Sequence, residues 1–139
     1  KKMSKSDENA NSCVAVLDKP EDILRKFKRA ITDSDGCVKY AEGKDGINNL
    51  MGIYSCVTGK TNEQIEAEFA GKGYGDFKTA VADAVIEHLK PRQEKFAQYI
   101  GDKAYLEKCY TESAQKALAV SNRTLRKVMK KIGFIPKAF

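Results

Sequence analysis

Two lysines and two serines close to the start of the chain form the pattern best suited to chemistry. They stand in the pentapeptide Lys2-Met3-Ser4-Lys5-Ser6. Ammonium groups and hydroxyls on a short polar loop can neutralise the charge that builds on the β- and γ-phosphates of ATP as pyrophosphate leaves. A loop that closes at that moment favours the transition state over the bound substrate. We therefore interpret Lys2 and Lys5 as candidate catalytic residues, and the pentapeptide as a candidate ATP-binding loop. A polar N-terminal segment without function is the alternative.

A second candidate site is a run of basic residues near the end of the chain. No acidic residue follows Glu112, whereas residues 113–139 carry seven lysines and arginines. Five of them recur at spacings of three and four, which places them on one face of a helix. These candidate RNA-binding residues are Arg123, Arg126, Lys127, Lys130 and Lys131. Such a stripe suits the phosphates of an RNA backbone. A solvated basic face without a partner, or one that meets an acidic protein, fits the same pattern.

Composition indicates a globular protein. The 139 residues are 42% hydrophobic and 32% charged, which is enough for one domain with its own core. No apolar run approaches the roughly 18 residues of a membrane span, so we expect no membrane partner. No apolar stretch follows the basic start, so we expect no signal peptide and a cytoplasmic location.

The four cysteines do not predict a metal site. Cys13, Cys37, Cys56 and Cys109 are widely separated, and His88 is the only histidine. Zinc sites usually draw on closely spaced pairs of such ligands. We therefore expect no metal, and reduced thiols in the cytoplasm.

Apolar periodicity predicts helices along almost the whole chain, after a loop with a short β-like stretch at Cys13–Leu17. The expected helices cover residues 18–31, 47–57, 62–69, 76–100 and 102–132. The first should carry Ile23, Leu24, Phe27 and Ile31 on one face and end before a turn at residues 33–36, and Thr61 or Asn62 should cap the third. The last of them should turn these side chains inward: Leu106, Cys109, Leu118, Leu125, Val128 and Ile132. The sequence thus predicts a mainly α fold, a bundle of four to five helices.

Four segments resemble the C-terminal part of the bacterial-type tryptophanyl-tRNA synthetases. They are the KMSKS pentapeptide followed by Asp7 and Asn9, residues 30–36 (AITDSDG), residues 46–50 (GINNL) with Ile53-Tyr54, and residues 71–75 (GKGYG) with Phe77-Lys78. The pentapeptide is shared by many class I synthetases, and the other three are more specific to the tryptophan branch. The resemblance that these segments anchor extends over essentially all 139 residues.

The resemblance implies part of a tryptophan–tRNA ligase, which activates tryptophan with ATP and charges tRNA(Trp). Residues 1–17 would hold the KMSKS loop and the edge of the catalytic domain, and residues 18–139 an anticodon-binding helical domain. The full enzyme would use ATP with Mg²⁺ and would form a homodimer through a domain that lies upstream. Which residues read the anticodon bases is left open.

Because the chain starts on the motif, we expect the Rossmann domain and the tryptophan pocket to be absent. The isolated piece should then fold, bind no cofactor tightly and lack tryptophan-activating activity. The alternative is a stand-alone helical RNA-binding module without catalysis, in which the lysine-rich start is a coincidence.

Overall fold

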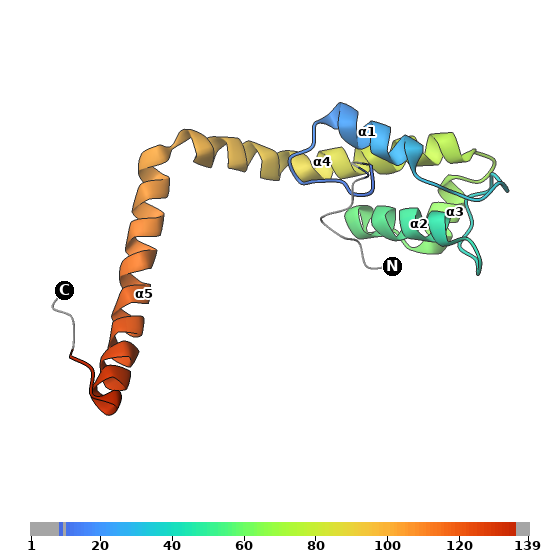
Figure 1. The fold of residues 1–139 in the computed structure, drawn as a ribbon. Coiled ribbons are helices and arrows are strands. Elements are labelled where there is room, and N and C mark those ends of the chain that lie inside the picture. Colours follow the sequence, from blue (N-terminus) through green and yellow to red (C-terminus); the bar gives the residue numbers. More distant parts are fainter. Residues whose placement is uncertain (1–8, 10, 136–139) are drawn as a thin grey trace. The chain divides into compact units, whose positions relative to one another are not determined.

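The computed structural model describes residue 9 and residues 11–135, and over this range the protein is built from helices joined by loops (Figure 1). There are five helices: α1 (Pro20–Arg29), α2 (Asp45–Thr58), α3 (Asn62–Glu68), α4 (Tyr74–Gly101) and α5 (Lys103–Ile132). The mainly α fold expected from the sequence is confirmed. The prediction of a β-like stretch at residues 13–17 is wrong, since these residues form turns and irregular backbone.

Local signals explain where the helices begin and end. Pro20 opens α1, where its missing N–H is not needed. Gly59 ends α2 and Gly133 ends α5, both in the left-handed conformation that glycine adopts without strain. Thr61 caps α3 and is one of the two capping residues that the sequence offers, the other being Asn62. The helix α4 begins at Tyr74, two residues before the expected start, and continues through Pro91.

The chain divides into two units, one ending at Glu94 and the other beginning at Lys95. The first unit holds one hydrophobic core to which α1, α2, α3 and the first part of α4 all contribute (Figure 1). Three aromatic rings meet edge to face within it, with centroids 4.9 Å apart for Phe69 and Phe77 and 5.7 Å apart for Tyr54 and Phe69. Such pairs add to the free energy that burial alone supplies.

The second unit consists of the end of α4, α5 and the residues that follow, and none of its described side chains is buried. The sequence-based prediction of an inward face on the last helix is therefore wrong. Leu118, Leu125, Val128 and Ile132 are all about half exposed or more, Cys109 is exposed, and Leu106 is only partly covered. A helical period shows that one face is apolar, but it does not supply the surface that covers it.

The expected apolar face of the first helix is partly wrong as well. Ile23 and Phe27 are buried in the core, as predicted. However, α1 ends at Arg29, so Ile31 lies beyond the helix on non-helical backbone and is 90% exposed. The chain leaves the helix two residues before the apolar pattern ends.

Candidate functional site

The pentapeptide Lys2–Ser6 lies outside the described residues, so its expected role stays a prediction. The structure does describe the segment that follows it. The backbone N–H of Ser12 donates to the carbonyl of Asn9 at 2.9 Å, and the N–H of Asn11 donates to the Asn9 side-chain oxygen at 3.0 Å. These bonds close a tight turn directly after the motif region.

Two side chains fasten this segment to the helices of the first unit. The Asp18 carboxylate accepts from the Lys26 ammonium on α1 at 2.5 Å and from the backbone N–H of Ala15 at 2.8 Å. The amide of Gln93 on α4 donates to the carbonyls of Val16 and Asp18 at 2.8 and 3.0 Å. The hydrogen bond from Lys26 lowers the pKa of Asp18, which keeps the carboxylate charged and the anchor intact at neutral pH. Residues 15–18 are thus held at both α1 and α4.

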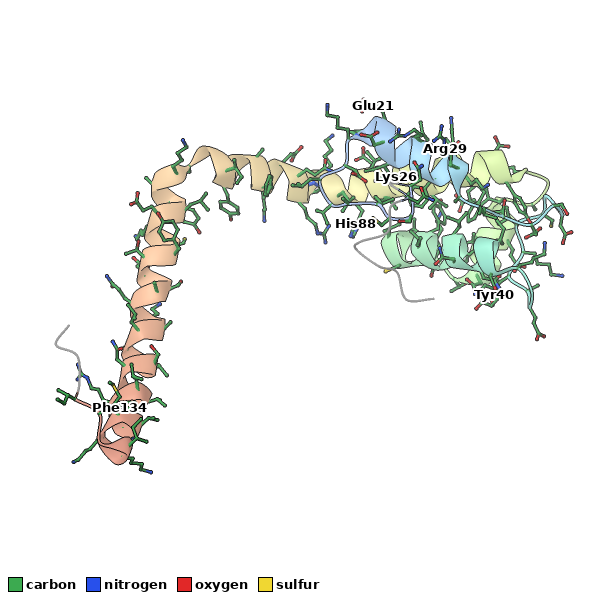
Figure 2. The ribbon with its side chains drawn as sticks, viewed as in Figure 1. Glu21, Lys26, Arg29, Tyr40, His88 and Phe134 are labelled. Atoms are coloured by element: carbon green, nitrogen blue, oxygen red, sulfur yellow. The ribbon has the colours of Figure 1, made fainter. Side chains whose placement is uncertain are left out.

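A hollow of about 460 Å³ lies beside the same segment. Figure 2 labels two of its lining residues, Lys26 on α1 and His88 on α4. The rest of the lining is largely aliphatic and aromatic, and includes Val14, Phe27, Leu50, Ile53, Val57, Val85 and Leu89. This lining suits apolar contact more than acid–base chemistry.

A polar cluster of three side chains joins the loop after α1 to the starts of α2 and α4. One carboxylate oxygen of Asp33 accepts from the Tyr74 hydroxyl at 2.5 Å, from the Lys44 ammonium at 3.2 Å and from the backbone N–H of Asp35 at 3.0 Å. The other oxygen is buried without a partner. The Tyr74 bond is the main cause that lowers the pKa of Asp33 to about 2. Hydrogen bonding to Asp35 is the main cause that raises the pKa of Lys44.

The five basic residues expected to bind RNA all lie on α5 and are all exposed. Among the residues that the structure describes, none of the five makes an ion pair, so no described side chain neutralises their charges. Their spacing places Arg123, Arg126, Lys127, Lys130 and Lys131 within one face of a straight helix. The geometry can therefore present a continuous stripe of positive charge to a polyanion.

Sequence reasoning missed an aromatic pair near the start of α5. The rings of Tyr99 and Tyr105 stack with centroids 5.4 Å apart and an angle of 16° between their planes. Tyr105 precedes Arg123 by 18 residues, which is about five helical turns, so it lies on the same face as the basic stripe. That count could have been made from the sequence alone. The partner Tyr99 could not, because it belongs to another helix.

Within the described part of the chain, no group of three histidine, cysteine or acidic side chains is placed to hold a metal ion. The four cysteines are all exposed there. No described helix is long and apolar enough to cross a membrane.

Comparison with known protein families identifies the class of protein to which the chain belongs. The family model described as “tRNA synthetases class I (W and Y)” matches residues 1–90. The chain belongs to this family of class I tRNA synthetases.

Individual relatives within this family point to one amino acid, tryptophan. The chain is 50% identical to a tryptophan–tRNA ligase of Clostridium tetani and 48% identical to one of Clostridium acetobutylicum, in each case over 97% of this chain and 40% of the relative. The solved tryptophanyl-tRNA synthetase of Mycoplasma pneumoniae is 27% identical, with a TM-score of 0.73 over 98% of this chain and 43% of that one. The chain thus spans about two fifths of the length of the relatives it matches.

Proposed function

We propose that this chain forms the KMSKS loop and the tRNA-binding helical part of a tryptophan–tRNA ligase, which activates tryptophan with ATP and charges tRNA(Trp). One observation carries the proposal: close relatives with that name match nearly every residue of the chain, at up to 50% identity. Residues 1–17 would belong to the catalytic side and residues 18–139 to the helical side. The complete enzyme would use Mg²⁺ with its ATP, act as a homodimer and work in the cytoplasm.

In this proposal the lysine motif acts on the leaving pyrophosphate. Lys2 and Lys5 would neutralise the charge that develops on the β- and γ-phosphates, while Met3, Ser4 and Ser6 complete the ATP-binding loop. The anchor made by Asp18, Lys26 and Gln93 supports this role, because it fixes the downstream end of the segment that carries the loop. A loop with one fixed end can close on the phosphates and open again while its anchored end keeps it close to the site.

The stripe on α5 would grip the tRNA backbone. Each lysine or arginine that neutralises a phosphate releases a condensed counterion, so binding should weaken steeply as salt rises. The absence of any ion pair at these five residues, over the described part of the chain, supports this role. Such contacts position the RNA but do not read its sequence.

The first test is the binding of the 139-residue chain to tRNA with the anticodon CCA, measured across a salt series. The same tRNA with those three bases changed is the comparison. Tighter binding of the CCA form at moderate salt would support both the anticodon role and the identity of the amino acid. Equal binding of both forms would mean that the stripe is only a backbone grip, and would contradict anticodon reading by this chain alone.

The catalytic part needs a full-length enzyme that carries this chain as its C-terminal part. There, Lys5→Gln should slow tryptophan-dependent ATP–pyrophosphate exchange about 100- to 1000-fold, the usual loss when one transition-state charge partner is removed. Lys28→Gln is the matched control, because Lys28 is an exposed lysine on α1 without an ion pair among the described residues. Exchange at the unmodified rate in Lys5→Gln would refute the proposed role. The 139-residue chain alone should show no exchange above background.

A further inference from the structure

The stacked tyrosines Tyr99 and Tyr105 are the feature of the second unit that phosphate binding does not explain. Their side chains are 44% and 45% exposed, although stacked aromatic rings usually contribute most when they are buried. They flank the junction between α4 and α5 at Gly101 and Asp102. The Asp102 side chain accepts from the backbone N–H of Tyr105 at 2.9 Å, which caps α5 and fixes the position of that residue.

The Tyr105 hydroxyl keeps its proton at physiological pH. The neighbouring Cys109 thiol, one turn further along α5, is the main cause that raises the pKa of this hydroxyl. The uncharged ring lies with one face against the ring of Tyr99. An aromatic surface that is already ordered loses little conformational freedom when it binds a flat ligand.

The charge around the pair indicates the chemistry of that ligand. Residues 95–139 carry ten of the 25 basic residues and three of the 19 acidic ones, which gives this unit a charge of +7. Lys108 and Lys116 lie on the same face of α5 as Tyr105 and link it to the stripe at Arg123, roughly 27 Å away along a helix that rises 1.5 Å per residue. The only acidic residue on that face, Glu112, lies 3.9 Å from the Lys108 ammonium.

We propose that Tyr99 and Tyr105 form a platform on which an unpaired base of an RNA loop stacks, while the basic face of α5 holds the phosphates of the adjoining stem. This inference rests on the proposed tRNA binding and names residues that would contact the bases. Unstacked bases of RNA loops commonly lie on exposed aromatic side chains. A paired stem offers no free base face, and an acidic peptide would use the charges but not the flat rings. The aromatic pair thus favours a looped RNA over both.

The experiment measures the binding of the whole 139-residue chain to two RNAs of equal length at several salt concentrations. One is a short hairpin with CCA in its loop, and the other is a fully paired duplex. The variants are Tyr99→Leu and Tyr105→Leu, which remove a ring but keep a good helix former, and Tyr99→Phe and Tyr105→Phe, which keep the ring. Tyr110→Leu is the matched control, since Tyr110 is a 63% exposed tyrosine on α5 that points about 140° away from Tyr105 at 100° per residue.

We expect each leucine variant to weaken hairpin binding about 5- to 150-fold, the range found for the loss of one base–aromatic stack, and to leave duplex binding unchanged. The phenylalanine variants and Tyr110→Leu should bind the hairpin within about twofold of the unmodified chain. Helix content measured by circular dichroism should be the same for all five.

Two results would overturn the platform. One is hairpin binding by the leucine variants at full strength, and the other is an equal loss of hairpin and duplex binding. If Arg126→Gln weakens hairpin binding while the leucine variants do not, the platform fails and the proposed tRNA grip stands. If the unmodified chain binds neither RNA, the proposed tRNA binding by this chain fails, and the platform fails with it.

Discussion

At the scale of single residues, Asp33 is the clearest case in which the fold changes the chemistry of a side chain. One of its oxygens accepts three hydrogen bonds, while the other is buried without a partner. The donors come from the loop itself, from Lys44 just before α2 and from Tyr74 at the start of α4. The charged carboxylate is thus the group around which these three segments meet.

This arrangement predicts a specific dependence of stability on pH. The pKa of Asp33 is about 2 in the folded chain, below its ordinary value of 3.8, because Tyr74, Asp35 and Lys44 donate to the carboxylate. A lowered folded pKa gives stability that is present above the ordinary pKa and lost as pH falls toward the folded one. Asp33→Asn should therefore be less stable at pH 7 and should lose less stability between about pH 4 and about pH 2.

Urea unfolding at pH 7, 4 and 2.5 measures this difference. Asp22→Asn is the control, because Asp22 makes an exposed ion pair with Arg25 within α1, of the kind that contributes little to stability. The free energy of unfolding that Asp22→Asn loses on acidification should match the loss in the unmodified chain. If Asp33→Asn loses as much stability on acidification as the unmodified chain, the Asp33 carboxylate does not cause the acid sensitivity.

A second residue-scale prediction concerns Gly46, in the first turn of α2. A Cβ atom at this position would lie 2.2 Å from the carbonyl oxygen of Ile31, a backbone atom that has no rotamer to change. Gly46→Ala should therefore lower the free energy of unfolding by about 1–3 kcal/mol, the usual cost of overpacking. Thermal or urea unfolding of the variant gives the value.

The same helix offers the matched control. Gly52 lies in the middle of α2, and a Cβ added there meets nothing within 4 Å. Gly52→Ala should raise stability by about 0.5–1 kcal/mol, because alanine loses less backbone freedom than glycine on folding into a helix. The close approach of α2 to Ile31 would be disproved if both variants changed stability in the same direction.

The sequence identified residues 33–36 only as a turn, and the reason is physical. The partners Asp33 and Tyr74 stand 41 residues apart, and no local pattern encodes a contact across that distance. The lysine motif and the basic stripe were recognisable because their residues are neighbours in sequence or on one helix face. Side chains brought together by the packing of separate segments were not.

At the scale of elements, α3 shows how a short helix is held. It has only seven residues, too few to be stable alone, and it carries the fully buried Ile65. The Thr61 side chain accepts from the backbone N–H of Gln64, and the Gln64 side chain accepts from the backbone N–H of Thr61 at 2.9 Å. This reciprocal cap satisfies donors that a helix start otherwise leaves free.

Removing the cap should have a measurable effect. Thr61→Ala should lower the free energy of unfolding by about 1 kcal/mol, the typical loss for such a replacement. Thr79→Ala is the control, since the Thr79 hydroxyl only donates back to the carbonyl of Gly75 within α4 and caps nothing. That variant should stay within about 0.5 kcal/mol of the unmodified chain. Equal losses in both would mean that the reciprocal cap contributes nothing special.

Helix positions were predictable because apolar residues recur with the helical period and because Pro20, Gly59 and Thr61 mark ends. The burial of the side chains on α5 could not be predicted in this way. Its apolar residues follow the same period as those of α2, yet α2 buries Ile47, Leu50, Met51 and Tyr54, whereas no described side chain of α5 is buried. Period describes a single helix, whereas burial depends on what packs against it.

At the scale of the whole chain, the two units differ in both burial and charge. Residues 1–94 carry 15 basic and 16 acidic side chains and contain the core, whereas residues 95–139 carry ten and three and have no buried residue among those described. Hydrophobic burial is the main term that stabilises a fold, so the two units should not be equally stable. The unit with the weaker packing is the one that carries the proposed RNA contacts.

Hydrogen exchange of the backbone amides tests this difference. Amides of α2 and of the first part of α4 should exchange only through large-scale unfolding, because their side chains form the core. Amides of α5 should exchange much faster, since no buried side chain opposes local opening of that helix. Adding the CCA hairpin RNA should slow exchange in α5 and leave that of α2 unchanged, because a ligand stabilises the segment that it binds. Equal protection of α2 and α5 without RNA would show that the exposed helix is held by contacts that burial in this chain does not reveal.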